Sequence, residues 1–171
     1  LLQTLARVAI SVELQPTLAV LLESLHKLVP FDGGAIFVRE TGREILRARA
    51  TRGYPPDLAV PSTTGLVGEV IRSGQSQLVR DVRHEPAYVA VRPSTSAQLA
   101  VPLASPRGIL GAIVLESDRP SAFAEQDLDL VTLFGQQATI VIERAVLHEQ
   151  LIRQSRLDRD MEIARDILKG L

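Results

Sequence analysis

The stretch from Glu125 to Leu171 constrains the fold of this chain more than any other part of the sequence. It contains no proline, and its only glycines are Gly135 and Gly170. A continuous helix over these residues would be roughly 70 Å long at about 1.5 Å per residue. A single domain of this size is not that wide. We therefore expect the helix to cover the body of the domain with its first part and to project beyond it with its last part.

Two apolar patterns follow each other along this predicted helix. The first is a broad stripe, which suits a helix that lies on a sheet, and it comprises Leu128, Val131, Phe134, Ala138, Val141, Ile142 and Ala145. The second has the narrower spacing, alternately four and three residues, of a coiled-coil seam, and it comprises Leu157, Met161, Ala164, Leu168 and Leu171. The phase slips between the two patterns, across Gln150 and Gln154. We predict that the second part pairs with the same helix of another copy of the chain.

Composition excludes several function classes. The 19 basic and 20 acidic side chains nearly cancel, so no broad positive field attracts nucleic acid or an anionic membrane. The absence of cysteine excludes disulfides, thiolate nucleophiles, thiolate metal sites and thioether attachment of a chromophore. No uninterrupted apolar run has the length of a membrane span, and Arg7 and Glu13 stand where a signal peptide would be apolar. We expect a soluble, cytoplasmic protein with one globular domain.

The N-terminal residues are expected to form two helices. Apolar residues recur at intervals of three and four from Leu1 to Val12. Pro16 suits the first turn of a second helix, where its missing N–H is not needed, and Pro30 would end that helix. We assign residues 1–15 to a linker helix that takes part in dimerisation. The predicted dimer interface comprises Leu5, Val12, Leu147, Leu151, Leu157, Met161, Ala164 and Leu168.

Five runs with β propensity lie between the helices, at residues 33–40, 44–51, 77–82, 97–104 and 108–117. Turn residues that include Gly42 and Gly108 join the first two runs and the last two runs as hairpins. Pro102 cannot donate to a strand ladder, so its strand is expected to lie at an edge or to bulge there. The pattern predicts an α+β fold, with an antiparallel sheet of about five to six strands flanked by helices.

The second of these runs alternates strictly in polarity. Leu46, Ala48 and Ala50 would share one face of the sheet, and Ile45, Arg47 and Arg49 would share the other. One face of the sheet is therefore expected to be exposed to water at this strand.

The block from Gly65 to Val82, GLVGEVIRSGQSQLVRDV, has the glycines of a phosphate-binding loop but not its spacing. Neither GxxxxGK[ST] nor GxGxxG is present. Hydroxyls from Thr63 and Thr64 would cap the start of a short helix, and Gly74 would close it. We predict a short capped helix that begins at Gly65.

A catalytic or metal role for Asp81 and His84 has little support in the sequence. No Ser, Cys or second carboxylate stands at a supporting spacing, and His26 and His148 form no ligand cluster with His84. Asp81 fits the cap of a turn that follows a strand. We predict no catalytic residue and no metal site.

The order of elements and four sequence segments together resemble a GAF domain. The segments are GLVGEVIRSGQSQLVRDV, DVRHEPAYV, LAVPLASPRGILGAIVLES and FAEQDLDLVTLFGQQATIVIERA, and the resemblance covers about Pro16 to Ala145. The resemblance implies a sheet between two helical layers, as in GAF and PAS-like folds, and a ligand pocket walled by the short helix and the following loop. We place the sensor domain at residues 16–148. The pocket residues that we assign on this basis are Tyr54, Gly65, Val67, Asp81, His84, Tyr88, Arg92 and Ser96.

The ligand of such a pocket is not named by the sequence, and its cofactor is unknown. Covalent bilin attachment and the methionine sulfoxide reductase branch of the family both require cysteine, which is absent. The cyclic-nucleotide branch resembles N-K…F-x-x-x-D-E, of which this chain keeps only Phe123 and Asp127. A hydrophobic staple between Phe123 and Leu128, with Asp127 at the helix start, explains both residues without a ligand. Haem would depend on His84 alone, and a loop histidine is more often a surface residue. A module that binds a small molecule and a module that only dimerises both stay open.

The last sixteen or so residues carry a second resemblance. The run Glu162-Ile163-Ala164-Arg165-Asp166-Ile167 is similar to the helix that enters SpoIIE-type, metal-dependent serine/threonine phosphatases of bacterial signalling, with Leu168 in place of the usual Gln. The resemblance implies that residues 149–171 form a coiled-coil linker to an effector phosphatase domain. None of the metal-binding carboxylates of such a phosphatase is in this sequence. We therefore expect a regulatory fragment without catalytic activity.

Overall fold

An antiparallel sheet of six strands, in the order β3-β2-β1-β6-β5-β4, forms the centre of the fold. The computed structural model describes residues 2–171, and the side chains from Leu14 onward. The strands are β1 (Gly33–Arg39), β2 (Ile45–Arg52), β3 (Ala59–Pro61), β4 (Gln77–Val79), β5 (Ala97–Ser105) and β6 (Gly108–Ser117). The helices are α1 (Leu2–Leu28), α2 (Gly65–Ser73), the 3₁₀ turn η1 (Val82–His84) and α3 (Glu125–Lys169). The predicted α+β class and strand number are confirmed, although the sequence did not reveal β3.

Two hairpins build the middle of the sheet. Gly42 and Gly108 both have positive φ, 75° and 113°, which a glycine adopts without the penalty of a Cβ. Pro102 lies opposite Ala112 of β6. On its other side β5 has no partner strand at this position, because β4 pairs only with residues 98–100 of β5. The predicted edge position of Pro102 is therefore confirmed.

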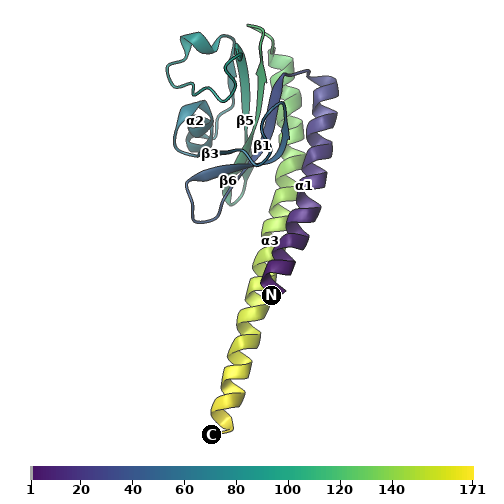
Figure 1. Cartoon of the computed structure of the whole chain (residues 1–171), viewed down its shortest axis with the longest axis vertical. Coiled ribbons are helices and arrows are strands. Elements are labelled where there is room, and N and C mark those ends of the chain that lie inside the picture. Colours follow the sequence, from purple (N-terminus) through teal and green to yellow (C-terminus); the bar gives the residue numbers. More distant parts are fainter. Residues whose placement is uncertain (1) are drawn as a thin grey trace.

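Helices cover both faces of the sheet (Figure 1). On one face, α1 and α3 pack on alternate side chains of the central strands, which include Leu99, Val101 and Ile113. On the other face, α2 and the loop that follows β4 cover a second cluster, to which Ala100 and Val114 contribute. Strands β5 and β6 thus carry one set of side chains toward the long helices and the other set toward α2.

A bulge in β2 corrects the predicted alternation of that strand. Opposite β1, the register shifts between Ile36 and Phe37, so that Ala48 and Ala50 are successive partners and Arg49 is the extra residue. Ala48 packs on the α2 side and Ala50 packs on the α1 and α3 side. The prediction that both alanines share a face was wrong, because one inserted residue in a strand moves the side chains on its far side to the opposite face of the sheet.

The prediction of two N-terminal helices was also wrong. A single helix, α1, runs from Leu2 to Leu28 and contains Pro16. A proline within a helix removes one hydrogen bond and costs about 3 kcal/mol. Packing of α1 along α3 and against β2 outweighs this cost, since Leu18, Leu22 and Leu25 are almost fully buried. The predicted boundary at residues 15 and 16 therefore lies within a continuous helix.

The long C-terminal helix is confirmed as one element, α3, of 45 residues. At its start Phe123 is buried, and Asp127 Oδ2 accepts a hydrogen bond of 2.8 Å from the backbone N–H of Ala124, as the staple and cap predicted. Gly135 brings the helix close to the sheet, because an added Cβ would lie 3.4 Å from Leu103 Cδ2. Arg107 Nη1, at the β5–β6 turn, donates a 2.8 Å hydrogen bond to Gln150 Oε1.

Beyond Gln150 the helix projects from the domain (Figure 1). Every residue from Arg153 to Leu171 is exposed. Over one window α3 also has the length and apolar composition of a membrane span. One such helix is weak evidence for a membrane span, since core helices pass the same test, and Val131, Ala138 and Ile142 of α3 pack in the core of the domain.

Candidate functional site

A small cavity lies between α2, the loop after η1 and the sheet. Its volume is about 80 Å³. Most of its wall is apolar, and the side chains that form this part are Phe37, Val60, Pro61, Leu66, Val67, Val89, Val91 and Val114. Val89 and Val91 lie in the loop and are 62% and 38% exposed. They edge the cavity without being buried, so the loop side of the cavity is its open side.

Glu116 is the polar centre of this cavity. It is 1% exposed, at the end of β6. Its Oε1 accepts hydrogen bonds from Tyr88 Oη at 3.2 Å and Gln98 Nε2 at 3.0 Å, and its Oε2 accepts one from Thr95 Oγ1 at 2.8 Å. These donors come from the loop and from β5 and are uncharged, and the phenol of Tyr54 also hydrogen-bonds to Glu116.

Gln98 leaves one polar atom without a partner. Its side chain is 4% exposed and lines the cavity beside Glu116. Its amide nitrogen donates to Glu116, but its Oε1 is buried and accepts no hydrogen bond. Such orphaned buried acceptors are uncommon in native proteins, and each calls for a partner such as an ordered water or an ion.

Burial and the charge of this carboxylate raise the pKa values of both tyrosines of the chain. Burial, followed by the negative charge of Glu116, raises the pKa of Tyr88 to about 12. The same two causes, with burial the larger, raise the pKa of Tyr54 far above its ordinary range. Both phenols are therefore neutral donors at physiological pH.

Arg92 closes one side of the site without reaching the carboxylate of Glu116. Its guanidinium forms an ion pair with Asp118 at 3.0 Å. Its aliphatic part crosses Gly33, where an added Cβ would lie 2.5 Å from Arg92 Cδ and 3.3 Å from Tyr54 Cε1. A larger residue at this point would displace the Arg92 side chain, because the arginine and the tyrosine pack directly on the backbone.

The first turn of α2 also lines the cavity, at Thr64, Gly65 and Leu66. Thr64 is the N-cap residue, as predicted, but its side chain makes no capping hydrogen bond, which corrects the expected role of the hydroxyl. Gly74 closes the helix with a φ of 68°, as predicted. The N-terminal turn of α2 therefore faces the cavity without a side-chain cap.

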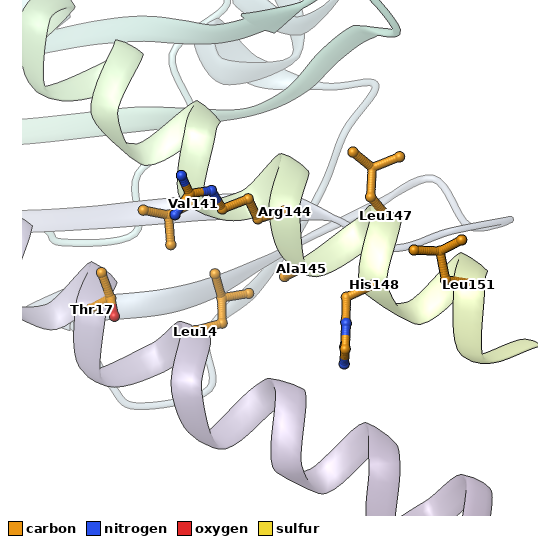
Figure 2. Close-up of a pocket in the computed structure, with 8 residues that line it drawn as sticks. All are labelled: Leu14, Thr17, Val141, Arg144, Ala145, Leu147, His148 and Leu151. Carbon is orange, nitrogen blue, oxygen red and sulfur yellow. The ribbon is translucent and has the colours of Figure 1, made fainter.

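A second hollow lies between α1, at Leu14 and Thr17, and the part of α3 from Val141 to Leu151 (Figure 2). Its volume is about 570 Å³, and it is lined by Leu14, Thr17, Val141, Arg144, Ala145, Leu147, His148 and Leu151. In Figure 2, His148 projects from α3 toward α1, and Leu147 leaves α3 on another side. Leu147 is 39% exposed and Leu151 is 69% exposed, so an apolar strip remains uncovered along α3.

Comparison with known families identifies the family to which this fold belongs. The sequence model of the GAF domain matches residues 13–144. The chain belongs to the GAF family. In signalling proteins this domain is a regulatory sensor module, and it is generally not catalytic. No curated protein matches the sequence.

Solved structures share the fold of this GAF domain at low sequence identity. A type II free methionine-R-sulfoxide reductase from Thermoplasma acidophilum has a TM-score of 0.73 and 20% identity, over 79% of this chain and 96% of that chain. The GAF domain of an Acinetobacter phosphoenolpyruvate-protein phosphotransferase has a TM-score of 0.72 and 20% identity, over 85% and 95%. Residues 122 to 287 of a methyl-accepting chemotaxis protein have a TM-score of 0.67 and 19% identity, over 86% and 98%.

The cavity of this GAF domain includes three of the residues assigned from the sequence, namely Tyr54, Gly65 and Val67. Tyr88 reaches it through its hydrogen bond to Glu116. Arg92 packs beside it on Tyr54 and Gly33. That these residues bind a ligand stays a prediction.

Asp81, His84 and Ser96 do not line the cavity. Asp81 caps η1, where its Oδ1 accepts from the backbone N–H of Arg83, and the hydrogen bonds from Arg83 lower its pKa to about 2. The side chain of His84 is 81% exposed. Ser96 acts through its backbone, which bonds to Ser117 and to Val82. The turn interpretation of Asp81 is therefore confirmed.

Sequence reasoning missed the polar centre, which consists of Thr95, Gln98 and Glu116. One signal was present: Glu116 follows the apolar run GAIVL at the end of a strand, and Gln98 directly precedes the apolar run LAVPLA. A charged residue at the buried end of a strand needs partners. Pairing of Gln98 with Glu116 across β5 and β6 depends on the hairpin register, which only the structure provides.

Along the described part of the chain, no group of three or more His, Cys, Asp or Glu side chains could hold a metal ion. The predicted interface residues Leu157, Met161, Ala164 and Leu168 are exposed on the projecting part of α3. The side chains of Leu5 and Val12 lie outside the described residues. The dimer itself stays a prediction.

Proposed function

We propose that this chain is a cytoplasmic sensor and dimerisation module whose C-terminal helix controls a downstream effector in bacterial signalling. The observation that carries the proposal is the projecting part of α3. Leu157, Met161 and Leu168 are 54%, 58% and 70% exposed, and they repeat at coiled-coil spacing. Apolar side chains in such a row are stabilised when two identical helices bury them against each other.

A path for the signal runs through β5 and β6. These strands carry Gln98 and Glu116 at the cavity, and they pack Leu103 and Ile113 against α3 on the opposite face. Their connecting turn bonds to Gln150, where the helix leaves the domain. A ligand that moves these strands would therefore shift the helix at the point where its two apolar patterns are out of phase. To move a two-state dimer from 1:99 to 99:1, about 5.5 kcal/mol of differential binding is sufficient.

Cysteine cross-linking tests this arrangement, because the natural chain contains no cysteine. Leu157→Cys places a thiol on the predicted seam, and Ile163→Cys places one off the seam at a similar exposure of 52%. A disulfide requires Cβ atoms roughly 3.5–4.5 Å apart. The seam variant should form a covalent dimer rapidly under mild oxidation, and the control should not. Equal rates for the two variants would refute the seam.

For the effector we propose a metal-dependent serine/threonine phosphatase that follows this module in the full-length protein. Support comes from the run at residues 162–167, which lies on the outer end of α3. The full-length protein should hydrolyse p-nitrophenyl phosphate with Mn²⁺, and oxidation of Leu157→Cys should fix its rate at one value. A full-length protein without this activity would remove the phosphatase assignment and leave the dimer proposal standing.

A ligand-free dimerisation module is the second candidate. It is favoured by the size of the cavity, since about 80 Å³ is small beside the roughly 300–1,000 Å³ of typical ligand pockets. The same volume disfavours a cyclic nucleotide. The two candidates differ in one measurement, because a ligand that binds only the folded domain must raise its melting temperature.

A further inference from the structure

A third hollow lies between the β1–β2 hairpin and α3, on the face of the sheet opposite α2. Its volume is about 500 Å³, which is within the roughly 300–1,000 Å³ of typical small-molecule sites. Val38 and Ile142, from the core under the long helices, form part of its wall. We call it the arginine hollow, because the charged side chains that line it are Arg39, Glu40, Arg43, Arg49, Glu149 and Arg153.

The two carboxylates of the arginine hollow already have cationic partners. Glu40 accepts a hydrogen bond from Arg47 Nε, and its Oε2 lies 3.7 Å from Arg43 Nη1. The hydrogen bond from Arg47, and then the charges of Arg47 and Arg43, hold the pKa of Glu40 below its ordinary value. Glu149 Oε1 accepts a hydrogen bond of 3.1 Å from Arg153 Nη2. The negative charge within the hollow is therefore already engaged.

Two of the arginines have no such partner. Arg49, the extra residue of the β2 bulge, forms no ion pair with any side chain that the structure describes. Its Nε is buried and donates no hydrogen bond. Arg39 Nη1 donates to the carbonyl of Ile109 at the long distance of 3.4 Å. A buried N–H of a charged group without an acceptor is costly, so Arg49 calls for an anion.

The arrangement suits a phosphoryl group better than a carboxylate. A guanidinium group presents several N–H donors in a planar fork that pairs with two oxygens of one anion. A phosphoryl group has three acceptor oxygens and a charge of about −1.5 to −2 near pH 7, so more than one fork can bind it. A carboxylate has two oxygens and one charge, and one fork occupies it.

We propose that the arginine hollow binds the phosphoryl group of a small molecule, held by Arg39 and Arg49 of the hairpin and by Arg153 of α3. This site goes beyond the proposed function, since it requires neither a ligand in the cavity at α2 nor a dimer. Arg153 follows Gln150, which the β5–β6 turn holds, by three residues. The bound group would therefore tie α3 to the β1–β2 hairpin at the point where the helix leaves the domain.

The phosphoryl group could come from inorganic phosphate or from an organic phosphate ester. The two sources are compared by titration calorimetry with inorganic phosphate and with phenyl phosphate, on the whole chain at a fixed salt concentration of about 0.15 M. Phenyl phosphate should bind saturably and more tightly, because the hollow is larger than a single phosphate ion and has an apolar part. Tighter binding of inorganic phosphate would make the free ion the ligand of the same site.

Two control compounds separate the phosphoryl group from its surroundings. Benzyl alcohol has a ring without the phosphoryl group, and succinate has two negative charges on carboxylates. Both should bind at least 10-fold more weakly than phenyl phosphate. In nitrogen-detected NMR, phenyl phosphate should shift the Nε–H signal of Arg49, and the two controls should leave it unchanged.

Two variants locate the phosphoryl group, each with a matched control. Arg49→Gln should weaken phenyl phosphate by roughly 10- to 100-fold, since it removes hydrogen bonds between charged groups. Arg153→Gln, at a more exposed residue, should weaken it by roughly 2- to 5-fold. The controls are Arg52→Gln on the same strand, where the arginine pairs with Glu23, and Arg159→Gln on the projecting part of α3. Neither residue lines the hollow, so both controls should retain the affinity.

A third variant should act in the opposite direction. Glu40→Gln removes a carboxylate that repels the anion, and its amide oxygen can still accept from Arg47. Arg43 then becomes available to the phosphoryl group. The affinity for phenyl phosphate should rise by roughly 2- to 5-fold. Glu44→Gln, the same change at an exposed residue of the hairpin, should leave it unchanged.

Three results would overturn the proposal. The first is the absence of saturable binding by both phosphate compounds, and the second is binding of succinate or benzyl alcohol as tight as that of phenyl phosphate. The third is an unchanged affinity in Arg49→Gln and Arg153→Gln when circular dichroism shows that both are folded. If Arg49→Gln does not fold, an unchanged affinity in both Arg153→Gln and Glu40→Gln has the same meaning.

Discussion

Replacement of Ile142 by alanine tests whether α3 is held on the sheet as described. Ile142 is 1% exposed, in one core cluster with Leu18 of α1 and with Val131 and Ala138 of its own helix. An Ile-to-Ala change at such a site costs about 2–5 kcal/mol, from the lost burial and the cavity left behind. In a domain of this size each kcal/mol lowers the melting temperature by roughly 2–4 °C. We therefore expect a loss of about 4–20 °C.

Ile167→Ala is the matched control, since it makes the same change on the same helix at a residue that is 63% exposed and off the predicted seam. Surface changes of this kind usually stay within about 0.5 kcal/mol. Both variants are compared with the natural sequence by urea denaturation and thermal melting, at one protein concentration because dimerisation makes stability concentration-dependent. If Ile142→Ala cost no more than Ile167→Ala, the packing of α3 on the sheet would be wrong.

Two further predictions concern stability. Gly53→Ala should destabilise the fold far more than Gly42→Ala: both glycines have φ near +75°, but an added Cβ at Gly53 would collide with the Asp32 carbonyl and one at Gly42 meets nothing. Denaturant titration should give about 1–2 kcal/mol for Gly42→Ala, and equal costs would contradict the close approach at Gly53. The free energy of unfolding should also fall as pH rises from about 10 to 12, because the folded chain keeps phenol protons on Tyr54 and Tyr88 that the unfolded chain loses. Absorbance at about 295 nm reports these two tyrosines alone in this chain, which has no tryptophan, and half-ionisation near pH 10 in the folded state would contradict the buried site.

The elements that the sequence predicted well are those specified by local chemistry. Gly42 and Gly108 fixed the hairpins, and Phe123 with Asp127 fixed the start of α3. The length and spacing of the C-terminal apolar pattern indicated a projecting helix, and every residue from Arg153 onward is exposed. These features depend on neighbours within a few positions, so a single sequence is sufficient to find them.

The features that escaped prediction depend on contacts between distant segments. Continuation of α1 through Pro16 is decided by packing on α3, which no local rule contains. The bulge at Arg49 is a property of the β1–β2 pair. The polar centre forms only because β5 and β6 bring Gln98 beside Glu116 and the loop brings Tyr88 above them. Asp81 and His84 were assigned to the pocket because the whole loop was expected to line it. In the structure only later residues of the loop, Val89 and Val91, line the cavity.

The molar mass of the chain in solution, measured by light scattering during gel filtration, tests the central claim most directly. The account predicts the mass of two chains for the natural sequence, and the mass of one chain for Leu157→Asp, because a charge on the seam cannot be buried against its copy. Ile163→Asp, off the seam, should remain a dimer. A natural chain that elutes with the mass of one chain at every concentration tested would contradict the account.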